Sequence, residues 1–313
     1  MKARTWRLFL LAAGWFFLQG CKSDGNTNSK PLDDFENGTI HISCDESFRP
    51  VMDEQVSAYN NLHPNAHIIV HYKPEAECLR DLLVDSIRMV VATRGLSERE
   101  RAVIVDSLGV GPEQLTVARD LVAVILHPSA GETFFTMQEI RELLSGKSKE
   151  NLIPVFDGAQ ATSTVRFMLD SVLKGDTLSS RVVAAQNSRE VIDYVKRVPN
   201  TVGFVGFSWI GNNDDTSQTA ARRQLRLAYL ESKDSAGAYQ QPSQYVIYTN
   251  SYPMVRDLVY VLKEKHRGLG HAFAYFLQQS DKGQLIFRRS YLMPVLRPNY
   301  IRDARLNENI NNQ

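Results

Sequence analysis

Strand-like runs alternate with helix-like segments over residues 38–108, and this alternation limits the possible folds more than any other feature of the chain. The strand-like runs are rich in β-branched residues, and the segments between them carry apolar residues at helical spacing. Strand–helix–strand order favours parallel strands covered by helices, so the region predicts an α/β unit. The predicted strands are 38–43, 66–72 and 89–92, and the predicted helices run from Pro50 to Pro64, over 75–85 and from Ser97.

The second half of the chain repeats this alternation. The apolar run 121–126 is typical of a strand buried on both faces. Thr136 and Glu139 form a capping-box pattern, and Gly146 ends the helix that follows. We predict strands at 153–156, 201–205, 225–230, 245–248, 255–262 and 291–295, helices at 164–173, 188–197 and 269–279, and a loop or hairpin at 212–223. A clamshell of two α/β lobes, with the chain crossing twice between them, fits this order.

The amino terminus reads as an export signal. Lys2, Arg4 and Arg7 precede an apolar run over 8–18, which is shorter than the roughly 20 residues of a membrane-spanning helix. The stretch 18–21 (LQGC) resembles the lipobox of bacterial lipoproteins, which implies a signal peptide over 1–20 and a lipid such as palmitate on Cys21. The alternative is an ordinary secretory signal in which Cys21 is incidental. Polar residues 21–37 predict a flexible tether.

Charge and cysteine content exclude several classes of protein. Removal of residues 1–20 changes the formal net charge from +1 to −2, because three basic and no acidic residues are lost, so nucleic acid is not an expected partner. Cys44 and Cys78 are compatible either with a disulfide or with two buried thiols. The seven histidines lack metal-ligand spacing, and we predict no metal and no cofactor.

Catalytic motifs are absent from the sequence, which contains no G-x-S-x-G, H-E-x-x-H, P-loop or dinucleotide-binding glycine pattern. We therefore predict a protein that is not an enzyme. Hydroxyl-rich turns instead follow predicted strands at 45–47 and 161–164. Each turn could be a simple helix cap, but helix starts at the carboxyl ends of strands also bind anions.

Several stretches, in this order, resemble the phosphate-binding proteins of bacterial ABC transporters, which have the type II periplasmic binding protein fold. The resemblance covers 38–298 and rests on the stretches 44–50, 89–97, 121–128, 136–146, 198–205, 252–256 and 282–286. It implies a first lobe of 38–127 plus 245–300, a second lobe of 128–244 and a tail over 301–313.

The resemblance also implies a ligand site between the lobes, with altered charges. Arg88 stands where the family has a proton-accepting aspartate, and Asp157 stands near the family's arginine. Glu46 and Glu75 are additional acids. Arg94 either binds an oxyanion or fixes its loop, and Arg166 is expected on a solvated helix face. The predicted ligand-binding residues are Glu46, Ser47, Phe48, Glu75, Arg88, Thr93, Arg94, Asp157, Thr162, Ser163 and Thr164.

These features predict a monomeric, lipid-anchored solute-binding protein of the bacterial cell envelope, facing the periplasm or the exterior. It would capture phosphate or a related small oxyanion for an ABC permease. The altered charges leave a second hypothesis open, in which the same fold is an envelope sensing or interaction module that no longer binds phosphate. A hydrolase is the third possibility, but the sequence shows no nucleophile–base pair.

Overall fold

The computed structural model describes residues 33–109, 111–158 and 162–296. The predicted signal peptide, Cys21, the tail over 301–313 and most of the tether lie outside these ranges. Within the described ranges no helix combines the length and the apolar character needed to cross a bilayer.

The first lobe begins with the predicted parallel unit. Strands β1 and β3 pair in parallel, as do β1 and β2. Pro50 lies at the start of α1, and Ser97 forms a capping box with Glu100 at the start of α3, so the local signals set these helix starts. The elements are β1 (Gly38–Asp45), α1 (Arg49–Leu62), β2 (Ala66–Lys73), α2 (Glu75–Asp81), β3 (Ile87–Ala92) and α3 (Glu98–Leu108).

Two antiparallel strands cross between the lobes. Strand β4 (Glu113–Leu126) pairs with β12 (Val255–Leu262) over its first part and with β8 over its last part. The main strand order is β2-β1-β3-β12-β4-β8-β6-β7, so β12 and β4 lie at its centre. The chain therefore passes to the second lobe along β4 and returns along β12, as the clamshell prediction required.

The second lobe repeats the parallel arrangement with β6 between β7 and β8. Its elements are α4 (Met137–Ser145), β6 (Ile153–Phe156), α5 (Ser163–Phe167), the π-helix η2 (Met168–Leu173), β7 (Val183–Ala184), α6 (Ser188–Arg197), β8 (Thr201–Gly206) and the 3₁₀ turn η3 (Phe207–Trp209). Strands β5 (Phe134–Phe135), β10 (Tyr229–Glu231) and β11 (Tyr239–Gln240) form a small separate sheet.

Two segments differ from the sequence prediction. The expected loop over 212–223 contains helix α7 (Thr216–Arg223), which is capped by Asp215. The expected strand over 245–248 is helix α8 (Gln244–Tyr248), in which the adjacent residues Val246 and Ile247 are both buried. A strand would alternate these two side chains between its faces, so packing on one side requires a helical turn.

The remaining elements close the first lobe. They are the 3₁₀ turn η1 (Glu46–Phe48), β9 (Arg226–Leu227), α9 (Leu269–Gln279), α10 (Asp281–Arg289) and β13 (Met293–Pro294). The expected strand over 225–230 is divided into β9 and β10, and helix α10 was not predicted. Gln284 of α10 is buried and donates to the carbonyl of Val117 on β4, which fixes the helix against the crossing strand.

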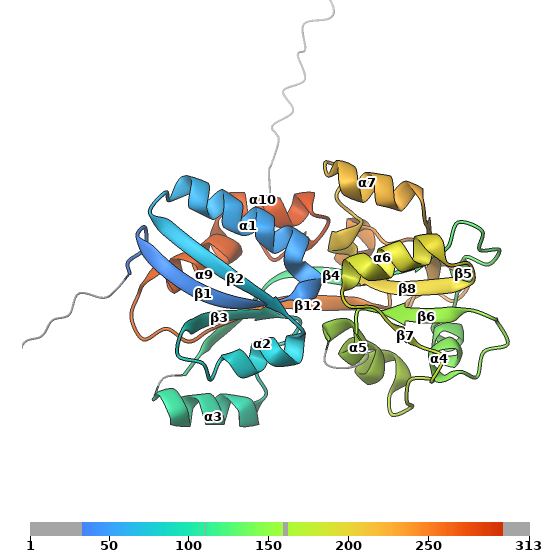
Figure 1. Cartoon of the computed structure of the whole chain (residues 1–313), viewed down its shortest axis with the longest axis horizontal. Helices are drawn as coiled ribbons and strands as arrows, with labels where there is room; N and C mark the ends of the chain where they lie inside the picture. Colours follow the sequence, from blue (N-terminus) through green and yellow to red (C-terminus); the bar gives the residue numbers. More distant parts are fainter. Residues whose placement is uncertain (1–32, 110, 159–161, 297–313) are drawn as a thin grey trace, which may run out of the picture. The chain divides into compact units, whose positions relative to one another are not determined.

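Separate hydrophobic cores define the lobes. In the first lobe α1, α9 and α10 pack on one face of the sheet and α2 and α3 on the other, as Figure 1 shows. The second core joins α4, α5, α6 and α8 to β6 and β8. Tyr252 and Met254, which the predicted division gives to the first lobe, pack in this second core. The exact residue boundaries of the lobes stay a prediction.

Cys44 and Cys78 are both buried in the first lobe, and both are free thiols. Burial raises the pKa of each thiol, so neither is a reactive thiolate at neutral pH.

Candidate functional site

The two predicted hydroxyl turns meet between the lobes. Ser47 follows β1 and Ser163 begins α5 after β6, so both lie beyond the carboxyl ends of strands. Their hydroxyl oxygens are 3.2 Å apart although the residues are 116 positions apart in the chain. Both side chains are fully buried. The site therefore lies at the strand edge where ligands of α/β proteins bind.

Asp157 provides the acceptor of this site. Its carboxylate accepts a hydrogen bond of 2.9 Å from the Thr162 hydroxyl, and the hydroxyls of Ser47, Thr164 and Ser188 lie 3.3–3.4 Å from Oδ2. The last three distances exceed the 2.7–2.8 Å typical of O–H···O bonds, so this oxygen is weakly held. Burial raises the pKa of Asp157 against the opposing hydrogen bond from Thr162.

Arg256 on β12 brings a positive charge to the same place. Its guanidinium donates to Asp120 at 3.0 Å and to the Ser163 hydroxyl at 3.0 Å, and it lies 5.0 Å from the centre of the Phe48 ring. A Cβ atom on Gly206 would approach Arg256 Nη2 to 2.7 Å, so only glycine leaves room for this arrangement. Phe48 is therefore part of the site as a support for the cation.

The carboxylates outnumber this cation. Besides Asp157, the buried acids Asp45 and Asp120 flank Arg256, and each has one oxygen, Asp45 Oδ2 and Asp120 Oδ1, without a hydrogen-bond partner among the described residues. Burial and the nearby Glu75 charge raise the pKa of Asp45 to about 7, and burial raises the pKa of Asp120. The site thus combines hydroxyl and guanidinium donors with acids that tend to hold protons.

The two predicted glutamates bind groups of the chain. Glu46 accepts from the backbone N–H and the hydroxyl of Ser188, at 3.2 and 2.9 Å, and so stabilises the start of α6. Glu75 accepts from the backbone N–H and hydroxyl of Thr93, at 2.9 and 2.5 Å.

Arg166 is not on a solvated face, contrary to the prediction. Its Nε donates to Glu75 Oε2 at 2.5 Å, and its Nη2 donates to the Thr93 hydroxyl at 2.6 Å. The prediction was wrong because a partner on another lobe leaves no trace in the local helical pattern.

Arg94 adopts the loop-fixing role of the two considered. Its guanidinium makes two bonds to Glu100, at 2.7 and 2.8 Å, and a third to the Gly95 carbonyl. These contacts join the end of β3 to the capping box of α3.

The structure contradicts the assignment of Arg88 to the ligand site. Arg88 lies near the start of β3, five residues or roughly 16 Å of strand from Thr93 at the site. It donates to Asp33 at 2.5 Å and to Glu264 at 3.0 Å. These acids in turn accept from backbone N–H groups at the start of α9, so Arg88 holds the helix and the first described residue together.

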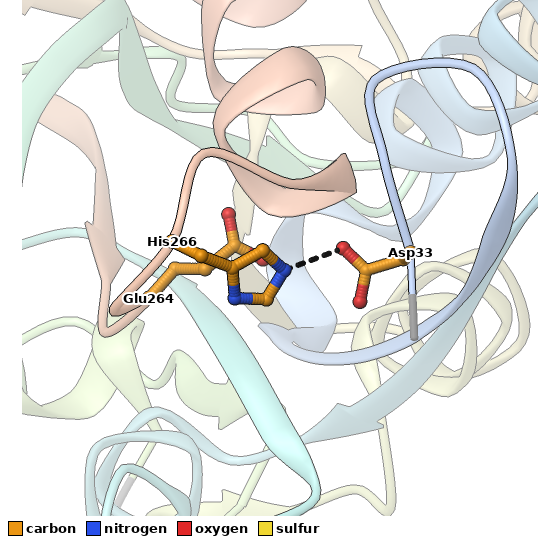
Figure 2. A group of neighbouring side chains, drawn as sticks. All are labelled: Asp33, Glu264 and His266. Atoms are coloured by element: carbon orange, nitrogen blue, oxygen red, sulfur yellow. Dashed lines mark hydrogen bonds and ion pairs between the residues drawn. The ribbon is translucent and has the colours of Figure 1, made fainter. Parts of the chain in front are cut away.

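Asp33, Glu264 and His266 carry the chain's metal-like grouping among the described residues, with ligand atoms within 4.8 Å of one another (Figure 2). Because Arg88 already donates to both carboxylates, a cation would have to compete with its charge. The grouping is therefore a structural ion cluster.

Sequence reasoning did not assign Arg256, Asp120 or Ser188 to the site. Arg256 ends the stretch 252–256 that resembles the phosphate-binding family, and Asp120 directly precedes the apolar run 121–126. A charged residue beside a doubly buried strand was the available signal for Asp120.

Two α/β lobes joined by crossing strands, with polar turns meeting between them, define a clamshell protein of the type II periplasmic binding fold. Residues 29–282 match the model of the PBP superfamily domain, and the chain belongs to this family. The fold and the family predicted from the motifs are therefore confirmed. No curated protein matches the sequence.

Solved structures show the same fold. A protein from Clostridium perfringens, described as a putative phosphate ABC transporter substrate-binding protein with bound phosphate, is 18% identical, with coverage of 83% of this chain and 100% of that one and a TM-score of 0.68. An ABC-type phosphate transport receptor from Vibrio cholerae is 16% identical, with coverage of 82% and 100% and a TM-score of 0.60. A single-residue variant of the OxyR2 regulatory domain from Vibrio vulnificus is 9% identical, with coverage of 76% and 97% and a TM-score of 0.51.

Proposed function

We propose that this protein is a lipid-anchored solute-binding protein that captures phosphate, or a related small oxyanion that carries a proton, for an ABC-type permease. The observation that carries the proposal is the convergence of Ser47, Ser163 and Arg256 on one buried point between the lobes. Phosphate is the ligand named for the Clostridium perfringens protein of the same fold.

The preference for a protonated oxyanion follows from the acids of the site. A buried anion beside Asp45, Asp120 and Asp157 is repelled unless protons accompany it. Phosphate and arsenate bring hydroxyl groups that donate to carboxylates, whereas sulfate at neutral pH only accepts. We therefore expect the protein to prefer phosphate and arsenate to sulfate.

Thermal unfolding and calorimetry of the purified protein test this proposal. Millimolar phosphate and arsenate should raise the melting temperature, because a ligand at a hundred times its Kd stabilises the native state by about 2.7 kcal/mol. Sulfate at the same ionic strength should have less effect. Equal shifts with all three anions would contradict selective binding.

The anchor is proposed from the sequence, since Cys21 lies outside the described residues. Acylated protein should partition into membranes, and Cys21→Ala should release it into the soluble fraction. Intact-mass measurement of the wild type should find the lipid on the residue that follows position 20.

A second candidate is the envelope sensing or interaction module. The observation that favours it is the direct contact of Ser47 with Ser163 and Asp157, since side chains of the protein itself occupy the donors. The fold also serves as a regulatory domain in OxyR2. An unchanged melting temperature with phosphate, arsenate and sulfate would favour this candidate over solute capture.

A further inference from the structure

Arg166 joins the two lobes. Helix α5 packs in the second core through Val165, and α2 packs in the first lobe through Cys78 and Leu79. From α5, Arg166 reaches Glu75 at the start of α2 and Thr93 at the end of β3. One side chain of the second lobe therefore makes two short hydrogen bonds to the first lobe.

The acceptor of this pair depends on the contact. The Glu75 side chain is 2% exposed and that of Arg166 is 32% exposed, so the carboxylate is removed from water while its cation stays partly solvated. Burial raises the pKa of Glu75, but Arg166 and Thr93 outweigh burial and bring the pKa below its ordinary value. Glu75 is thus ionised at neutral pH, and a buried carboxylate that loses its cation is strongly destabilised.

A second contact crosses between the same lobes. Glu46 follows β1 in the first lobe and accepts two hydrogen bonds from Ser188 at the start of α6 in the second. The chain thereby supplies bonds between its lobes on two sides of the hydroxyl site.

We propose that Arg166 is a positioning residue that closes the two lobes over the site in the absence of a ligand, through its pair with Glu75 and Thr93. In a clamshell that closes on its ligand, the ligand provides the contacts that favour the closed state. Here the ion pair provides them. The inference adds a closing device to the proposed function and holds whether or not phosphate is the ligand.

Two consequences follow for binding and for partners. A ligand must enter through an open state that breaks the pair, so the competent fraction is small and association is slow. The surface formed by the two closed lobes is present before any ligand arrives. Loss of the pair should therefore speed ligand association while it weakens closure.

The test is the distance between the lobes in ligand-free protein. Spin labels or dyes on Arg99→Cys in α3 and Gln138→Cys in α4 report this distance, because both positions are exposed and the thiols of Cys44 and Cys78 are buried. After phosphate removal by a scavenging enzyme, the otherwise wild-type protein should show one short distance that 1 mM phosphate leaves unchanged. Arg166→Gln should raise the open-to-closed ratio at least about tenfold, which corresponds to about 1.4 kcal/mol.

Matched variants separate the cross-lobe pair from other effects. Asp170→Asn removes the other partner of Arg166, which lies on the same helical segment of the second lobe, and should leave the distance unchanged. Glu75→Gln keeps the shape of the acceptor and should open the lobes as Arg166→Gln does, which keeps the test valid if one variant fails to fold. The double variant should open no further than either single variant.

The outcomes distinguish this inference from the proposed function. Wild-type lobes that are open without phosphate, at the distance of Arg166→Gln, would overturn the closing role even if phosphate binds. Closed lobes together with no heat of binding for phosphate or arsenate would support the closing role and contradict solute capture.

Discussion

Two buried ion clusters of this protein differ in how completely they are paired. At the start of α9, every carboxylate oxygen of Asp33 and Glu264 accepts at least one hydrogen bond. Between the lobes, Asp45 Oδ2 and Asp120 Oδ1 accept none from the described residues, and Asp157 Oδ2 has only long contacts.

The difference separates a structural cluster from a candidate binding site. Buried polar groups are normally paired, because an unpaired one loses its hydration without compensation. The α9 cluster obeys this rule and fixes where the chain enters the fold. The interlobe cluster departs from it at the strand edge where a ligand is expected, so its unpaired oxygens mark a site adapted for binding at a cost in stability.

The largest expected effect is the loss of the interlobe cation. Arg256→Gln would leave Asp120 buried without its partner, and we expect the free energy of unfolding to fall by about 3–5 kcal/mol. Urea unfolding measures this loss. The double variant with Asp120→Asn should recover part of it, and a loss of less than about 1 kcal/mol in the single variant would contradict the role of the pair.

A smaller loss is expected from the completed cluster. Arg88→Gln should lower the free energy of unfolding by about 2–4 kcal/mol, since the Arg88 side chain is 22% exposed and water compensates part of the change. Phosphate affinity should not change, because Arg88 lies far along β3 from the site. Lys147→Gln, in an exposed pair with Asp176, should cost no more than about 1 kcal/mol. Loss of binding with unchanged stability would return Arg88 to the ligand site.

The interlobe acids should also make stability depend on pH. The pKa of Asp45 is about 7 in the folded state and near 3.8 ordinarily, so the folded state binds more protons between these values. Stability should therefore fall as the pH rises from about 4 through 7, by up to about 1.4 kcal/mol per pH unit from this group. Urea unfolding at pH 5, 6, 7 and 8 measures the slope. Asp45→Asn should flatten it, and a slope that persists in this variant would assign the effect to other acids.

The smallest effect concerns one hydroxyl of the site. Ser163→Ala removes a donor that faces Ser47 and Arg256, and we expect phosphate to bind about tenfold more weakly, or by about 1.4 kcal/mol, in calorimetry. The control is Ser180→Ala, an exposed serine of the second lobe. An equal effect in both variants would exclude a specific contact with Ser163.

Local patterns determined much of the secondary structure. The capping boxes at Ser97 and Thr136 and the proline at α1 predicted helix starts that the structure confirms. Errors arose where tertiary packing decides. Strand β4 begins at Glu113, eight residues before the predicted start, because pairing with β12 rather than apolar pattern extends it. Helix α7 is polar apart from a few contacts, so its sequence resembles a loop.

The sequence by itself determined the α/β class, the order of the lobes and the two hydroxyl turns, since these depend on periodicity and on neighbouring residues. Only the tertiary structure decided which arginines serve the site. Arg88 pairs with acids at the far end of β3, Arg166 bridges to Glu75, and Arg256 reaches Ser163 from a crossing strand. A guanidinium on a long side chain pairs with whichever carboxylate the fold brings near, and spacing along the chain does not contain that information.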